Sequence, residues 1–154
     1  GGGGDRANVF YGIIDRRTLE LTYSAAGPVY GGIVRGATGK LERISSDDSP
    51  IEKGSHLKLG TIRSLNLEAR DRVFLVSAGT IAAKNKADEA FGEDRLIRSI
   101  LATPRSSTTS IHDVRNEIFY SVESHIGEQD LPQDVTAVVF EVKDRVIRLA
   151  PRRD

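Results

Sequence analysis

The stretch S-I-H-D-V-R-N-E-I-F-Y-S-V-E-S-H-I-G, which runs from Ser110 to Gly127, decides the helical part of the fold. Its apolar side chains recur at spacings of three and four, which places them on one face of a helix: Ile111, Val114, Ile118, Val122 and Ile126. Ser110 and Asp113 stand at the N-cap and N3 positions, a capping box in which Asp replaces Glu. Gly127 can end the helix in the left-handed conformation. The stretch therefore predicts an amphipathic helix.

Working outward, the chain changes from helical to strand-like patterns on both sides. A second helix is predicted over 93–101, with an apolar stripe formed by Leu96, Ile97, Ile100 and Leu101. Apolar or alternating runs predict strands at 8–14, 19–24, 31–35, 40–44, 61–67, 73–76, 135–142 and 145–149, joined partly as hairpins. The run 8–14 is expected to be covered on both faces, 73–76 to lie deep in a sheet, and 45–60 to form a surface loop. This order predicts an α+β fold with helices packed outside a mainly antiparallel sheet.

Composition narrows the class of protein. The chain has 154 residues, 38% of them hydrophobic, which suits one globular domain. Its 22 Lys and Arg residues balance 22 Asp and Glu residues, and this neutrality argues against nucleic-acid binding. There is no apolar run long enough to span a membrane and no cysteine, and we expect no signal peptide. We expect a cytoplasmic domain over 8–150, a flexible glycine-rich lead or engineered remnant over 1–7, and a tail over 151–154.

Residue spacing alone identifies no active site. The motif Gly36-x-x-Gly39-Lys40 lacks the spacing of a phosphate-binding loop, and a hairpin turn explains it better. His112 and His125 are too far apart on one helix to share a metal, so both are expected to be exposed. There is no G-x-S-x-G turn of a serine hydrolase.

The succession of segments, however, is that of a known family. The text F-Y-G-I-I-D, L-T-Y-S-A-A-G-P, F-L-V-S-A-G-T-I-A-A-K-N, F-G-E-D-R-L and P-Q-D-V-T-A-V-V-F-E-V appears in this order. It resembles the C-terminal part of the bacterial metal-dependent protein phosphatases (PPM family, protein phosphatase 2C-like) of the SpoIIE/RsbU type. There the text runs approximately F-Y-G-x-L-D, L-x-Y-x-N-A-G-H, L-x-x-Y-T-D-G-x-x-E-A-x-N, F-G-x-x-R-L and D-D-x-T-L-V-V. The match covers about residues 10–142, which correspond to roughly the later two-thirds of the family domain.

The resemblance implies an αββα sandwich: two antiparallel sheets with helices on both outer faces, of which this chain lacks the N-terminal part. It also implies hydrolysis of phosphoserine or phosphothreonine by water held between two divalent cations, manganese or magnesium. Family members act on anti-sigma-factor antagonists and related partner-switching proteins. The partner implied is therefore a phosphoprotein or an antagonist-like signalling protein.

The chain departs from the family pattern at the positions of metal ligands. The T-D-G step is Ser77-Ala78-Gly79, so a methyl group stands where the family has a ligating carboxylate. The first Asp of the D-D-x-T step is Gln133, and a neutral amide is a poor ligand for a hard cation. Asp134 keeps the family's second position and is the one candidate catalytic residue. We therefore expect no metal and no bound cofactor in this chain.

Two interpretations from different classes stay open, beside an unrelated α+β binding domain as the third. In the first, the domain is a catalytically degenerate phosphatase that binds a signalling protein in a partner-switching or sigma-factor pathway. In the second, it is part of an active manganese- or magnesium-dependent phosphatase. With upstream strands absent, we expect an unpaired sheet edge, and association with itself or with a complementary upstream segment.

Overall fold

The computed structural model describes residues 6–44, 51–52, 61–103, 109–131 and 134–143. The strands among these residues are β1 (Arg6–Ala7), β2 (Val9–Ile14), β3 (Glu20–Ala26), β4 (Tyr30–Val34), β5 (Leu41–Arg43), β6 (Ile51–Glu52), β7 (Arg63–Asn66), β8 (Arg72–Val76) and β9 (Ala137–Glu141). The helices are α1 (Ala78–Ala82), α2 (Gly92–Ala102) and α3 (Ile111–Ile126). The expected order of strands, helices and a further strand is confirmed.

Every strand pairing is antiparallel. One sheet has the order β2-β3-β7, a second has the order β5-β4-β8-β9, and β1 pairs with β6. In the second sheet, β8 lies between β4 and β9, with Phe74 opposite Gly32 on one side and Val139 on the other. The apolar run Val73–Val76 of β8 is explained by cover on both faces, from the helices on one side and from the other sheet on the second.

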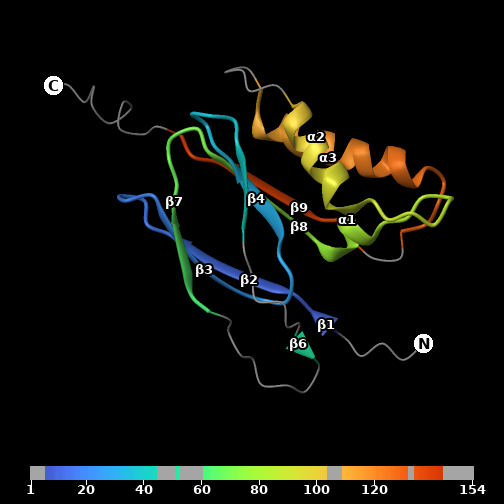
Figure 1. The fold of residues 1–154 in the computed structure, drawn as a ribbon, viewed down its shortest axis with the longest axis horizontal. Helices are drawn as coiled ribbons and strands as arrows, with labels where there is room; N and C mark the ends of the chain where they lie inside the picture. Colours follow the sequence, from blue (N-terminus) through green and yellow to red (C-terminus); the bar gives the residue numbers. More distant parts are fainter. Residues whose placement is uncertain (1–5, 45–50, 53–60, 104–108, 132–133, 144–154) are drawn as a thin grey trace.

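The elements stack in three layers, as Figure 1 shows: helices α2 and α3, the four-stranded sheet, and the three-stranded sheet. The predicted α+β sandwich of antiparallel sheets with outer helices is therefore confirmed. The described helices α2 and α3 cover the outer face of the four-stranded sheet, and their apolar stripes provide the contact. Residues 8–14 do not fit the expectation of cover on both faces.

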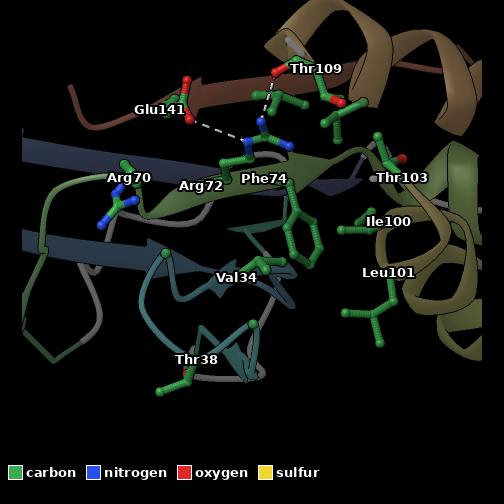
Figure 2. Close-up of a pocket in the computed structure, with 14 residues that line it drawn as sticks. Val34, Thr38, Arg70, Arg72, Phe74, Ile100, Leu101, Thr103, Thr109 and Glu141 are labelled. Carbon is green, nitrogen blue, oxygen red and sulfur yellow. Dashed lines mark hydrogen bonds and ion pairs between the residues drawn. The ribbon is translucent and has the colours of Figure 1, made fainter. Parts of the chain in front are cut away.

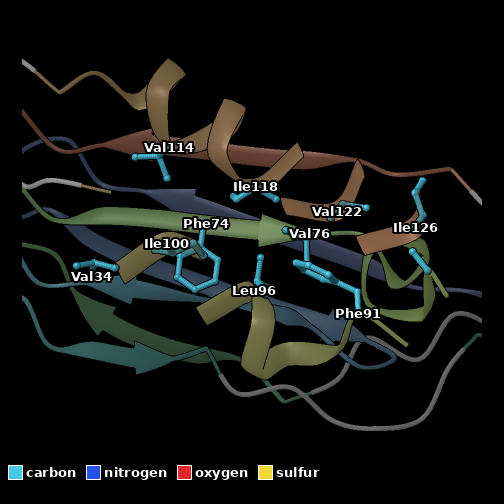
Figure 3. Packing of buried hydrophobic residues seen from close by; sticks show 11 residues of the cluster. Val34, Phe74, Val76, Phe91, Leu96, Ile100, Val114, Ile118, Val122 and Ile126 are labelled. Atoms are coloured by element: carbon cyan, nitrogen blue, oxygen red, sulfur yellow. The ribbon is translucent and has the colours of Figure 1, made fainter. Parts of the chain in front are cut away.

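The helical layer and the four-stranded sheet enclose the larger core. Figure 3 shows Val114, Ile118 and Val122 of α3 pointing toward the sheet, with Phe74 and Val76 of β8 pointing back at the helices. The helix begins at the predicted capping box: the backbone N–H of Asp113 donates to Ser110 Oγ (3.3 Å), and the N–H of Ser110 donates to Asp113 Oδ2 (2.8 Å). Each fully buried aliphatic side chain here stabilises the fold by roughly 1.5–3 kcal/mol.

A second core lies between the two sheets. Its members include Leu21 and Tyr23 of β3, Ile33 of β4 and Val73 of β8, all at most 5% exposed. Along β8 the side chains alternate, so Val73 enters this core while Phe74 enters the helical one. Tyr23 also stacks on Phe10 of β2, with the ring centroids 5.4 Å apart. The alternation predicted for 19–24 holds from Glu20 to Tyr23 but fails at Ser24, which is buried, and Leu19 lies in the turn before the strand.

A buried carboxylate fixes the β4–β5 hairpin to the start of β8. Asp71 is fully buried and accepts hydrogen bonds from Arg35 Nη1 (2.7 Å), the Gly36 N–H (2.8 Å) and the Glu68 N–H (2.8 Å). Arg35 also donates to Glu42 (2.8 Å), and this bond, with the further help of Asp71, raises the pKa of Arg35 above its usual value. The raised pKa favours the charged guanidinium, which lies 2.7 Å from the buried Asp71 carboxylate.

Three sequence expectations need correction. Val9, Tyr11 and Ile13 of β2 are 40%, 59% and 57% exposed, because no described element covers the outer face of the three-stranded sheet, onto which alternate side chains of β2 project. The expected loop 45–60 contains strand β6, and helix α1 was not predicted because five residues are too short to show a helical period. The expected strand 145–149 lies outside the described residues.

The apolar stripe predicted for the second helix is only partly buried. Leu96 and Ile100 of α2 are 2% and 6% exposed, whereas Leu101 is 51% exposed. Leu101 follows Ile100 by one residue, about 100° around the helix, so its side chain does not share the buried face. The hairpin predicted around Gly36 and Gly39 is confirmed, with β4 and β5 on either side and Gly39 at φ +73°.

Candidate functional site

The ends of β8 and β9 meet at the positions that the sequence singled out. Val76 of β8 is paired with Ala137 of β9, and the backbone N–H of Ser77 donates to the Thr136 carbonyl oxygen (2.9 Å). In return, the N–H of Thr136 donates to the Ser77 hydroxyl (3.0 Å), not to a backbone carbonyl. A side chain thus completes the ladder at the point where β8 turns into α1 (Figure 1).

The Ser77 hydroxyl also connects this turn to the segment before β9. It donates to the backbone carbonyl oxygen of Asp134 (3.0 Å) and lies 3.1 Å from Thr80 Oγ1. Thr80 is fully buried, and its hydroxyl reaches the Thr136 carbonyl oxygen at 3.4 Å. Because one hydroxyl serves several partners, Ser77 fixes the backbone on both sides of the candidate site.

The structure brings two of the three sequence-predicted positions together. Ala78 is the first residue of α1 and is half-buried. Asp134 is exposed, and its backbone is bonded to Ser77, the neighbour of Ala78. Gln133 lies outside the described residues. Position 78 and the segment of Asp134 therefore lie at the same end of the four-stranded sheet, as a shared site requires.

A hollow of about 260 Å³ adjoins Asp134. Its apolar wall is formed by Phe119, Val122 and Ile126 of α3 together with Leu131, and Glu123 of α3 adds a second carboxylate. Leu131 is 44% exposed although it is apolar. The candidate site therefore combines an apolar surface with two negative charges.

The histidines take no part in this arrangement among the described residues. His112 is exposed, as predicted, but the prediction for His125 is wrong. His125 is half-buried, its Nε2 lies 2.8 Å from the Glu89 carbonyl oxygen, and its ring meets Phe91 edge-on at 5.6 Å. Its position at the end of α3 lets it hold the loop before α2, which spacing along one helix could not reveal.

Residues 3–143 match the model of the Stage II sporulation protein E (SpoIIE) family. The chain belongs to the SpoIIE family. No curated protein matches this SpoIIE-type domain by sequence.

Solved structures agree with the architecture. The phosphatase domain of SpoIIE from Bacillus subtilis matches with TM-score 0.65 and 16% identity, over 90% of this chain and 59% of that one. The SiaA-PP2C domain of Pseudomonas aeruginosa matches with TM-score 0.71 and 15% identity, over 90% and 52%. The catalytic domain of the serine/threonine phosphatase PstP, solved with two manganese ions, matches with TM-score 0.57 and 17% identity, over 81% and 54%. This chain thus spans between half and three-fifths of the length of these structures and shares their fold.

The described residues of this SpoIIE-type domain do not fit a pair of divalent cations. Hard cations take oxygen ligands, chiefly carboxylates. Ala78 offers only a methyl group, and the two carboxylates at the hollow, Asp134 and Glu123, are both exposed. Across the described part of the chain there is no group of three or more His, Cys, Asp or Glu side chains placed to hold a metal. No reaction step through a metal is derived from these residues.

Sequence reasoning missed the residues that shape the site. Ser77 and Thr80 link β8, α1 and the segment before β9, yet the sequence attracted attention only to Ala78 between them. The sequence gives no signal for this: Ser77 stands at the N-cap position of α1, but its hydroxyl bonds the segment before β9 and makes no capping bond to the helix. The described helices also include none with the length and apolar character needed to cross a bilayer.

Proposed function

We propose that this SpoIIE-type domain is a protein-binding module of bacterial signalling that does not hydrolyse phosphoesters through a metal pair. The observation that supports this most directly is Ala78: a half-buried methyl group lies one residue from Ser77, whose hydroxyl bonds the Asp134 backbone. The resemblance places a ligating carboxylate at position 78. Without it, the cation pair that activates water in a two-metal enzyme loses a ligand from this end of the sheet.

The hollow beside Asp134 gives this module a surface for a partner. Exposed Leu131 and the half-buried Phe119 of α3 can bury an apolar side chain of another protein. Glu123 and Asp134 repel a phosphoryl group when no cation screens them. We propose that the partner is a cytoplasmic signalling protein of the anti-sigma-factor-antagonist type, bound preferentially in its unphosphorylated form.

The catalytic half of the proposal is tested by hydrolysis of p-nitrophenyl phosphate in the presence of manganese. The 154-residue chain is expected to give a progress curve no steeper than buffer, while the SpoIIE phosphatase domain of Bacillus subtilis serves as the positive control. Turnover that chelation of manganese abolishes would establish the alternative, part of an active phosphatase, and refute the proposal.

The binding half is tested by titration of an anti-sigma-factor antagonist in unphosphorylated and phosphoserine forms. Leu131→Asp is expected to weaken binding at least tenfold, roughly the loss that a buried anchor residue causes. Leu101→Asp is the matched control. Leu101 is also exposed, but it stands in the last turn of α2 and does not line the hollow. Equal losses in both variants, or tighter binding of the phosphoserine form, would contradict the proposed contact.

A further inference from the structure

A second and larger cavity lies at the opposite end of the four-stranded sheet. It has a volume of about 450 Å³ and lies between the β4–β5 hairpin and the facing ends of α2 and α3. Figure 2 shows Phe74 of β8 between Val34 of β4 and Ile100 of α2, with Leu101 of α2 at the rim. A packed protein interior rarely leaves voids larger than a water molecule, and small-molecule sites measure about 300–1,000 Å³. The cavity has the size of a ligand site.

The cavity is distinct from the candidate site at Ala78. Arg72 begins β8 and lines the cavity, whereas Ser77 follows the last residue of the same strand. Five residue steps of about 3.3 Å separate them, so the two places lie about 16 Å apart along the strand. What binds in the cavity is therefore independent of the function proposed above.

The wall of the cavity joins an apolar floor to a positively charged side. Its ionisable side chains among the described residues are Arg70, Arg72 and Glu141, two positive charges against one negative. The Arg72 side chain is only 12% exposed, with Nε 3.4 Å from Glu141 Oε1 and Nη2 donating to the Thr109 carbonyl oxygen (2.8 Å). A guanidinium has five N–H donors, and these contacts use two of them. Arg72 can therefore bind an anion without giving up its present partners.

The backbone conformation at the rim of the cavity fixes the position of its charged wall. Arg70 has φ +69°, an unusual value for a residue other than glycine. A Cβ on Gly36 would lie 2.6 Å from the Arg70 carbonyl carbon, so the hairpin packs directly on this backbone. The Gly36 N–H is in turn held by buried Asp71. The hairpin side of the cavity is thus built from rigid backbone contacts, as a preformed site requires.

We propose that this cavity binds a small organic anion with an apolar body and one carboxylate or similar group. Phe74, Ile100 and Val34 take the apolar body, and Arg72 binds the anionic group. A charged guanidinium that is largely out of water interacts strongly with an anion, and the net positive charge of the wall disfavours a cation of the same shape.

The test compares two probes with the same aromatic body and opposite charge, 2-naphthoate and 2-naphthylmethylammonium, titrated calorimetrically into the 154-residue chain. Naphthoate is expected to bind at one site per chain and at least tenfold more tightly than the ammonium probe, about 1.4 kcal/mol or more. Absence of saturable naphthoate binding, or equal binding of both probes, would overturn the proposal.

Three variants test whether naphthoate binds in this cavity. Arg72→Gln is expected to weaken naphthoate about tenfold while leaving the ammonium probe no weaker. Leu101→Trp narrows the rim without entering the core, since Leu101 is 51% exposed, and should weaken both probes. Tyr120→Trp, at a 66% exposed position on α3 away from the cavity, is the matched control and should change neither.

If Arg72→Gln fails to fold, as circular dichroism would show, Leu101→Trp and the comparison of the two probes still decide the matter. Naphthoate affinity that Leu101→Trp leaves unchanged would place the probe elsewhere on the protein and refute the site.

Discussion

Replacing Asp71 by alanine is expected to be among the most damaging single changes in this protein. The carboxylate is fully buried, and the change removes the acceptor of the Gly36 and Glu68 N–H groups and one of the two acceptors of Arg35 Nη1, which keeps its bond to the Asn66 carbonyl oxygen (2.8 Å). Removing one partner of a buried ion pair costs about 3–5 kcal/mol. Because the Arg35 side chain is 20% exposed and keeps Glu42, we expect the lower end, about 3 kcal/mol.

Two further variants should lose less stability than Asp71→Ala. Asp71→Asn can keep one acceptor oxygen toward Arg35 and Glu68 while it loses the bond to the Gly36 N–H, so its cost should be intermediate. Glu42→Gln changes the other partner of Arg35, but Glu42 is 53% exposed, and an exposed pair contributes below about 1 kcal/mol.

Urea denaturation followed by circular dichroism measures the difference. With a slope of about 2 kcal/mol per molar urea, Asp71→Ala should lower the midpoint by about 1.5 M, and Glu42→Gln by less than about 0.5 M. A midpoint for Asp71→Ala no lower than that of Glu42→Gln would refute the reasoning that this carboxylate fixes the hairpin.

Three other changes probe separate parts of the account. Gly36→Ala places a Cβ 2.6 Å from Arg70 backbone and should destabilise the fold by roughly 2 kcal/mol in urea denaturation, more than Gly92→Ala, where the added Cβ meets no atom within 4 Å and only the positive φ is strained; an equal cost would argue against the packing. Ser110→Ala removes the helix cap of α3 and should cost about 1 kcal/mol, against a negligible change for exposed Ser124→Ala. The exposed face of β2 should make the chain associate with itself in sedimentation velocity, and Tyr11→Lys should reduce this while Tyr120→Lys does not; a monodisperse unsubstituted monomer would contradict it.

Much of the helical layer could be predicted because its signals are local. The capping box at Ser110 and the stripe through Val114, Ile118 and Val122 depend only on neighbours in the chain, and the structure confirms them. The buried strand Val73–Val76 was equally clear, because an unbroken apolar run has few alternatives.

The features that the sequence did not predict depend on contacts between distant segments. The apolar run of β2 does not say which neighbour covers it, and here Tyr11 and Ile13 stay exposed. Asp71 lies in the polar sequence Glu68-Ala69-Arg70-Asp71, which is typical of an exposed turn, and only the hairpin residues Arg35 and Gly36 make it a buried acceptor. The large cavity is likewise formed by elements far apart in sequence.

For the candidate site, the sequence identified the positions, and only the structure shows which residues surround them. Ala78 and Asp134 were selected by resemblance to the family, 56 residues apart. The bonds from Ser77 to Asp134 and Thr136 could not be foreseen, because they require the register of β8 on β9. The role assigned to Gln133 stays a prediction.

The most direct test of the central claim is calorimetric titration of Mn²⁺ into the unsubstituted chain, Ala78→Asp/Gln133→Asp, and Ala82→Asp as a control for added charge on α1. The account predicts no saturable micromolar binding by the unsubstituted chain or the control, and a gain of at least tenfold in the double variant, because two carboxylates then join Asp134. Micromolar binding by the unsubstituted chain, or a double variant that binds no better than the control, would contradict it.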